Sequence, residues 1–107
     1  MNGSDLKQTG IPIMLDKERH FIFDLNAMEA IEEKYGSIDE ALSAAGKQKM
    51  KDMKFLIYQG LLHEDESLTL DQVGKIVNML NLTEISHALL QGMGFALPDT
   101  KEKGKNV

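Results

Sequence analysis

The sequence contains no cysteine and no tryptophan, and only 2 of its 107 residues are proline. Without cysteine the chain can form no disulfide, no thiolate metal site and no cysteine nucleophile. No segment approaches the roughly 20 consecutive apolar residues that a membrane-spanning helix needs. The amino terminus lacks a basic segment followed by an apolar run, so no secretory signal is visible. These absences lead us to expect a soluble, cytoplasmic protein without a membrane partner.

Positive charge is also scarce, because 12 Lys and Arg residues face 17 Asp and Glu residues and leave a net charge of −5. A protein that binds nucleic acid neutralises phosphates with a basic surface, so nucleic acid is not an expected partner. Methionine, by contrast, is abundant, with 7 copies. These flexible side chains either fill gaps in a small core or line a surface that adapts to a partner, and both readings stay open.

Apolar residues alternate along residues 11–15 and again along 20–24, and a polar connector, residues 16–19, separates the two runs. Alternation with a connector of this length predicts a β-hairpin. Pro12 cannot donate a ladder hydrogen bond, so the first strand should lie at an edge. Residues 1–10 are polar and are expected to form a flexible lead-in.

Five helices are expected between residues 26 and 97. Four of them begin at residues with the spacing of a capping box, namely Asn26 and Glu29 (with Asp24 as a competing cap), Ser37 and Glu40, Thr69 and Gln72, and Asn81 and Glu84. Gly36 and Gly46 are expected to end the first two helices. The third, residues 47–62, begins with four lysines (Lys47, Lys49, Lys51 and Lys54) and becomes apolar on nearly all sides.

In the fourth helix the apolar residues Val73, Ile76, Val77 and Leu80 are spaced so that they fall on one face. The fifth helix is expected to end before Pro98. Residues 98–107 are polar and lysine-rich and are expected to form a disordered tail. The predicted fold is therefore α+β and mostly α. An N-terminal β-hairpin (11–24) precedes a compact bundle of about five short helices (26–97), and together they form one globular domain over residues 11–97.

The motifs of enzymes and metal sites are incomplete in this chain. His63 and Glu64 begin like a zinc-protease motif, but Ser67 stands where the second histidine is needed. A calcium-loop pattern over residues 65–76 fails because Leu70 occupies the obligatory glycine position. No nucleophile lies beside a base in any recognisable pattern. We therefore expect no enzymatic activity, no cofactor and no metal.

Charge is distributed unevenly along the chain: residues 24–40 are rich in acids, whereas residues 47–54 are rich in lysine. The two segments are either complementary faces of one monomer or a contact with another copy or partner. The apolar excess of the third helix likewise belongs either to the core or to a groove for a partner helix. If it forms a groove, the candidate partner-binding residues are Tyr58, Leu61, Leu62, Leu89, Met93 and Leu97.

Several segments resemble the tail assembly chaperones of siphophages and prophages, and similar small proteins occur with gene transfer agents. The resemblance covers residues 11–97 and is carried by residues 21–28, 31–37, 56–65 and 68–74. It implies a non-catalytic chaperone that binds the tape-measure protein and assists tail-tube assembly. Such a chaperone acts in the host cytoplasm and is absent from the mature virion. The tail-tube protein is a further partner that it suggests. A weak homo-oligomer is a separate expectation, which follows if the two charged segments form a contact between copies.

Two other readings remain. A generic helical adaptor or regulator of a mobile element would bind one folded partner instead of coating a long helix. A DNA-binding regulator would use the last two helices as a helix-turn-helix. The last helix, however, carries no lysine or arginine, which recognition helices need for base and phosphate contacts.

Overall fold

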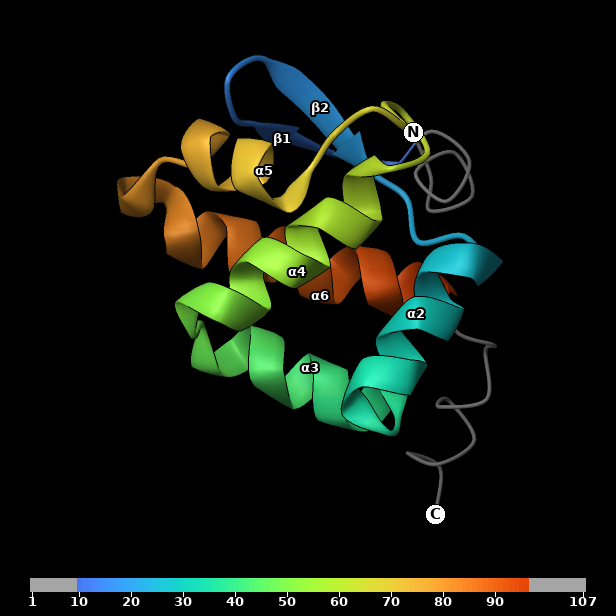
Figure 1. Ribbon diagram of the computed structural model, residues 1–107. Helices are drawn as coiled ribbons and strands as arrows, with labels where there is room; N and C mark the ends of the chain where they lie inside the picture. The colour runs from blue at the N-terminus through green and yellow to red at the C-terminus, as the bar shows by residue number, and fades with distance from the viewer. Residues whose placement is uncertain (1–9, 97–107) are drawn as a thin grey trace.

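The computed structural model describes residues 10–96. In this range a two-stranded antiparallel hairpin precedes five α-helices and one short 3-10 helix (Figure 1), which confirms the predicted mostly helical α+β fold. The expected lead-in, apart from Gly10, and the expected tail lie outside the described residues. Within those residues no helix combines the length and the apolarity needed to cross a membrane.

The hairpin consists of β1 (Ile11–Met14) and β2 (Glu18–Phe21), paired so that Ile11 lies opposite Phe21. Asp16 in the turn accepts hydrogen bonds from the Arg19 guanidinium at 2.8 and 3.0 Å, so the buried arginine has a partner. The alternation predicted from sequence is confirmed, because Ile11, Ile13 and Phe21 are buried on one face. That face packs on the helices.

The helices are α2 (Leu25–Tyr35), α3 (Ile38–Lys47), α4 (Met50–Leu61), α5 (Leu70–Ile76) and α6 (Leu82–Ala96), with the 3-10 helix η1 (Met79–Asn81) before α6. Helices α4 and α6 cross the middle of the molecule. The hairpin and α5 lie on one side of them, α3 lies on the other, and α2 closes one end (Figure 1). This arrangement places α2 and η1 at opposite ends of the molecule.

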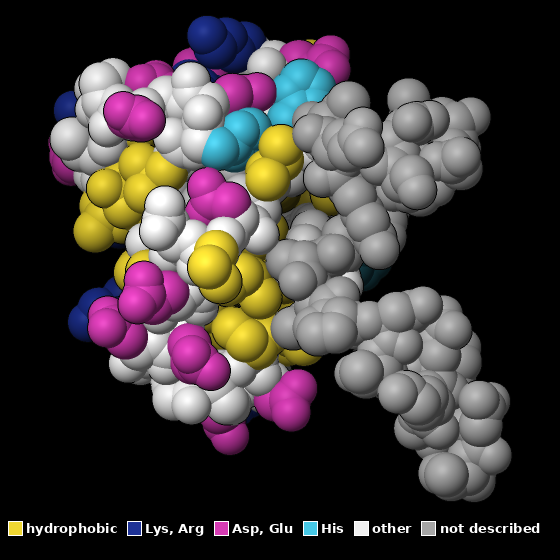
Figure 2. Space-filling view, turned by 90° about the vertical axis from the view of Figure 1, so that its right-hand side faces the viewer, with side chains coloured by type: hydrophobic (Ala, Val, Ile, Leu, Met, Phe, Trp, Pro, Cys, Tyr) yellow, Lys and Arg dark blue, Asp and Glu magenta, His cyan; other side chains and the backbone are white. Residues whose placement is uncertain are grey.

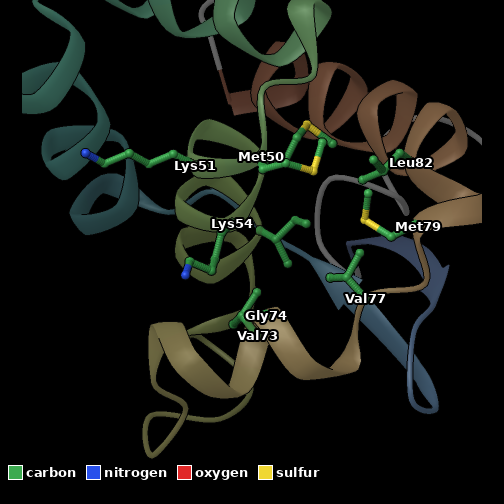
Figure 3. A pocket seen from close by; sticks show the side chains of 10 residues that line it. Met50, Lys51, Lys54, Val73, Gly74, Val77, Met79 and Leu82 are labelled. Carbon is green, nitrogen blue, oxygen red and sulfur yellow. The ribbon is translucent and has the colours of Figure 1, made fainter.

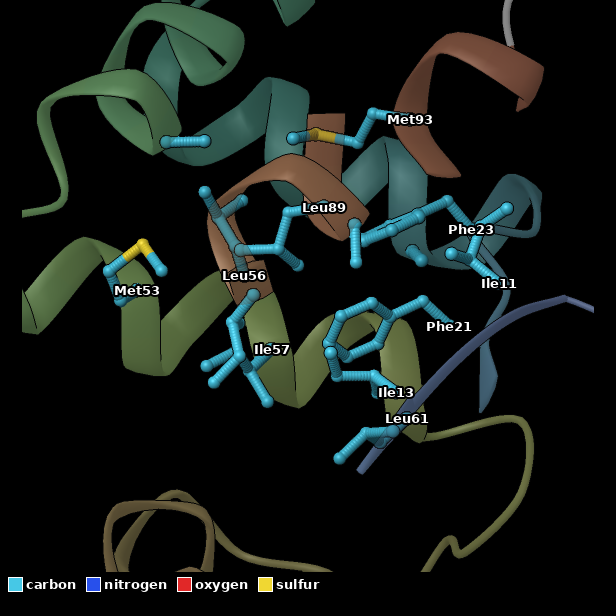
Figure 4. Packing of buried hydrophobic residues seen from close by; sticks show 14 of the residues in the cluster. Ile11, Ile13, Phe21, Phe23, Met53, Leu56, Ile57, Leu61, Leu89 and Met93 are labelled. Carbon is cyan, nitrogen blue, oxygen red and sulfur yellow. The ribbon is translucent and has the colours of Figure 1, made fainter. Parts of the chain in front are cut away.

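The core forms where the hairpin meets α4 and α6 (Figure 4). Its largest buried side chains include Phe21 from β2, Leu56 and Ile57 from α4, and Leu89 and Met93 from α6. Phe23 follows β2 and joins the same cluster. Its ring packs against glycines of α4 and α6, which lets both helices approach closely.

Two predicted helix boundaries are wrong around the junction of α3 and α4. Helix α3 does not stop at Gly46 but continues to Lys47, and Gln48 ends it in the left-handed conformation at φ 57°. Lys49 then occupies the N-cap position of α4, so the helix expected over residues 47–62 begins at Met50. The lysines of this segment therefore belong to two helices and the link between them.

The predicted fourth helix is also interrupted. Helix α5 ends at Ile76, and Leu80, expected on the inner stripe, is 91% exposed in η1. The side chain of Asn78 accepts a hydrogen bond from the Leu80 amide and caps η1. Asn81, predicted to cap the last helix, is the final residue of η1 and directly precedes α6. The capping box of Thr69 and Gln72 is confirmed, as is Ser37 as the cap of α3. At α2 the competing residue Asp24 is the cap, and Asn26 is not.

Candidate functional site

The six residues predicted to bind a partner do not form one surface. Leu61, Leu89 and Met93 are each 0% exposed and belong to the core, so the expectation that they line an open groove is corrected. Burial is the reason: helices α4 and α6 turn these positions toward the hairpin and one another. Tyr58 and Leu62 are partly buried, and Leu97 lies outside the described residues.

Tyr58 and Leu62 border a hollow between α2 and the end of α4, with a volume of about 530 Å³. The other side chains around it are largely polar: Asp24, Asn26, Gln59, His63 and Glu66, with Ala27 and Ala30. Apolar anchors of a partner helix would find few apolar neighbours here. The hollow is therefore a poor receptor for a helix that docks through apolar side chains.

A surface with the apolar side chains that such a helix needs lies elsewhere, between α4, α5, η1 and the start of α6 (Figure 3). We call it the methionine groove; it has a volume of about 380 Å³ and is lined by Met50, Lys51, Met53, Lys54, Ile57, Val73, Gly74, Val77, Met79 and Leu82. Figure 3 shows Met50, Met79 and Leu82 converging on a common space from three different elements. Lys51 and Lys54 project from α4 on the side away from Met79 and Leu82.

The groove exists because α5 is short. Thr69 begins this helix with a complete capping box, and the helix ends after 7 residues at Ile76 because Val77 adopts an extended conformation. Val77 and Asn78 then lead the chain into η1 instead of continuing the helix along α4. Helix α5 supplies one wall through Val73, which is fully buried.

The methionines of the groove differ in exposure. Met53 forms a buried base at 2% exposed, whereas Met50 and Met79 are 50% and 61% exposed at the rim. Solvent-exposed methionines on an apolar surface are typical of sites that repack around varied partners. Leu80, 91% exposed and next to Met79, extends the apolar surface beyond the rim.

The polar edge of the groove is positively charged. Lys51 and Lys54 are exposed, and the ion pairs found within residues 10–96 involve neither of them. The methylene stem of Lys54 lies against α5, where a Cβ on Gly74 would be 3.3 Å from its Cδ atom. Apolar stems with charged ends suit a ligand that combines apolar side chains with carboxylates.

A second apolar surface lies at the opposite end of the molecule, on α2 and the first residue of α3. We call it the acidic face, and it consists of Leu25, Met28, Glu29, Glu32 and Ile38, which line a hollow of about 570 Å³ with Phe23 and Asn26. Leu25 projects from it at 84% exposed. Figure 2 views the molecule from this end and shows hydrophobic side chains lying among acidic ones. This face therefore combines exposed apolar side chains with negatively charged carboxylates.

Helix α2 is fixed to α4 by a polar contact. The Tyr35 hydroxyl donates a hydrogen bond of 2.6 Å to the carboxylate of Asp52. Burial raises the pKa of Tyr35 above its ordinary value of 10.0, and the hydrogen bond to Asp52 makes a second, smaller contribution in the same direction. The Lys34 ammonium lies 4.9 Å from the centre of the Phe55 ring. These contacts hold the acidic face in a fixed position relative to the groove.

A third polar cluster ties the hairpin to the end of α4. His20 Nδ1 lies 3.0 Å from a Glu64 carboxylate oxygen, and His63 Nε2 donates to the His20 carbonyl oxygen at 2.7 Å. In the part of the chain that the structure describes, no three His, Asp or Glu side chains are grouped so as to hold a metal ion. The cluster therefore acts as a tether between two elements.

Sequence reasoning missed the methionine groove, although two signals for it were present. One is the excess of methionine, and the other is the Met-Lys pair that occurs at residues 50–51 and again at 53–54. Neither shows that α5 stops short and that η1 turns Met79 toward α4. Comparison with known proteins adds no relative, since no family model, no curated protein and no solved structure matches this chain.

Proposed function

We propose that this protein is a non-catalytic tail assembly chaperone of a phage or prophage, which binds the tape-measure protein and assists assembly of the tail tube. The observation that carries the proposal is the methionine groove, an exposed apolar surface with a lysine edge. The resemblance of residues 11–97 to such chaperones supplies the identity of the client. The tail-tube protein is proposed as a further partner, and the host cytoplasm as the place of action.

The groove suits an elongated helical client. An amphipathic helix binds through side chains at positions i, i+3 or i+4, and i+7, which fall on one side of two helical turns. Met50 and Met79 stand on opposite walls and can change rotamer to fit different side chains. A tape-measure helix offers many such segments of differing sequence, and one adaptable site can bind each of them.

Many copies on one client would act together. Each groove is small, so a single copy should bind weakly, but adjacent copies on a long helix shield a continuous apolar stripe. Weak individual contacts also permit release when tail-tube subunits replace the chaperone. This mode of action needs no catalysis, which agrees with the expectation of no enzymatic activity.

Co-expression with the tape-measure protein encoded nearby tests the proposal. We expect the tape-measure protein to become soluble and to co-purify with many copies of the tagged chain. Met79→Glu should abolish this, because it places a charge in the groove. Met14→Glu is the matched control: Met14 is 57% exposed, close to the 61% of Met79, but lies on β1 away from the groove.

Two results would contradict the proposal. One is an insoluble, unbound tape-measure protein beside a well-folded chain. The other is equal loss of binding in Met14→Glu and Met79→Glu. Recovery of one folded partner at one-to-one stoichiometry would instead favour the adaptor or regulator of a mobile element.

A further inference from the structure

We infer that, in the absence of a client, the acidic face of a second copy of this chain covers the methionine groove. The contact between copies is argued from two surfaces of this chain alone. Its role in protecting the client site rests on the proposed function. The two ideas can therefore fail separately.

The charges of the two surfaces are complementary in sign and in spacing. Lys51 and Lys54 lie three residues apart on α4, and Glu29 and Glu32 lie three residues apart on α2. All four side chains are exposed, and the ion pairs found among residues 10–96 join other residues. Side chains with this spacing are neighbours on one helix face, so α2 of one copy can lie along α4 of the next and form two ion pairs.

The apolar parts of the two surfaces are complementary as well. Leu25 projects from the acidic face at 84% exposed, one helical turn before Glu29, and can enter the groove beside Met50. Beyond the rim of the groove, next to Met79 in the chain, Leu80 is 91% exposed, and it can enter the hollow beside Met28 and Ile38. Each surface thus offers a projecting leucine and a hollow to receive one. Burying both leucines supplies apolar contact that exposed ion pairs alone do not.

The positions of the two surfaces decide the geometry of assembly. They lie at opposite ends of the molecule (Figure 1). Two copies related by a two-fold axis therefore cannot each place an acidic face on the groove of the other. The contact is head-to-tail, which leaves one groove open at the end of every assembly unless the assembly closes into a ring. A client helix can bind first at that open groove and then displace the neighbouring copies.

Sedimentation velocity of the unmodified chain over a range of concentrations is the first test. The average mass should rise from the 12.0 kDa of one chain toward roughly twice that value or more, as mass action requires for weak association. A monomer at every concentration would overturn the inference.

Charge reversal identifies the surfaces. The variants Lys51→Glu/Lys54→Glu and Glu29→Lys/Glu32→Lys should each be monomeric, because like charges then face each other. An equimolar mixture of the two, and the variant with all four changes, should associate again. Lys17→Glu in the hairpin turn is a single-charge control and should associate normally, whereas Lys51→Glu should weaken association. Circular dichroism establishes that each variant folds.

Association that survives both double reversals would overturn the proposed contact, since another surface would then be responsible. The protective role has its own test: Glu29→Lys/Glu32→Lys leaves the groove uncovered and should bind the tape-measure protein at least as tightly as the unmodified chain. Weaker binding by this variant would refute that role. Self-association without any binding of the tape-measure protein would refute the proposed function and leave the contact standing.

Discussion

Phe23 illustrates how single residues position the elements that carry both surfaces. Its ring lies where a Cβ on Gly60 of α4 would be 2.9 Å from Cζ, and a Cβ on Gly92 of α6 would be 2.9 Å from Cε2. Nothing larger than a hydrogen atom fits at these two positions without movement of the ring. Such a contact depends on the position of the ring, which only the whole fold determines.

Gly60→Ala should therefore destabilise the protein by about 1–3 kcal/mol, the usual cost of forcing an extra carbon into a packed core. The added carbon would also lie 3.0 Å from the Phe21 ring, so neither aromatic side chain can move away freely. Chemical denaturation measures the change in the free energy of unfolding. Gly46→Ala is the control: nothing lies within 4 Å of that Cβ, and alanine in α3 should stabilise the protein by roughly 0.5–1 kcal/mol. Equal effects of the two changes would show that packing at Gly60 is not tight.

Tyr35 predicts a pH dependence of stability. Because its pKa is higher in the folded protein than in the unfolded chain, its contribution is complete below about pH 10 and declines as the pH rises through the folded-state value. In Tyr58→Phe, Tyr35 is the only tyrosine left of the 2 in the chain, and its ultraviolet titration should have a midpoint above about 10. Adding Tyr35→Phe should reduce the loss of stability at alkaline pH. A midpoint near the unfolded value would contradict the buried hydrogen bond to Asp52.

Among the elements, α5 links local sequence to the groove most directly. Its 7 residues begin at a capping box in which Gln72 N donates to Thr69 Oγ1 at 3.1 Å. Thr69→Ala should cost about 1 kcal/mol and speed hydrogen exchange in residues 70–76 roughly fivefold. Ser37→Ala removes a cap with the same 3.1 Å hydrogen bond at the start of α3 and should leave exchange in α5 unchanged. Equal exchange in α5 for both variants would show that the cap does not limit the opening of this wall.

Element types were predictable from sequence, whereas several ends were not. Alternation at Ile11 and Ile13 and the caps at Ser37 and Thr69 are local signals, and the structure confirms them. Gly46 failed as a helix end because Gln48 adopts the left-handed conformation two residues later. An exposed glycine can remain in a helix at moderate cost, and an end depends on where the next element must begin.

At the scale of the whole molecule, the candidate site was the least predictable part. Helical spacing alone cannot separate a core face from an exposed one, so Leu61, Leu89 and Met93 were assigned to a partner although they are buried. The methionine groove draws on α4, α5, η1 and α6, which only the tertiary structure brings together. The methionines are divided between two environments, with Met53 and Met93 in the core and Met14, Met50 and Met79 exposed.

This division of the methionines yields a prediction for the molecule as a whole. Hydrogen peroxide should first oxidise Met14, Met50 and Met79, which are 57%, 50% and 61% exposed, and should reach Met53 and Met93 only when the protein opens. Peptide mass spectrometry measures this order. Oxidation of Met53 as fast as that of Met79 would contradict the arrangement of the groove.

The same treatment tests what the groove does. Sulfoxide turns a flexible apolar side chain into a polar one, so mild oxidation should abolish both self-association and binding of the tape-measure protein while circular dichroism stays unchanged. Met50→Leu/Met79→Leu should keep both activities and make them resistant to peroxide, because leucine preserves the apolar rim. Met14→Leu should give no protection, since Met14 lies on β1 outside the groove. If Met14→Leu protected and the double variant did not, the surface that binds partners would have to lie at the hairpin instead.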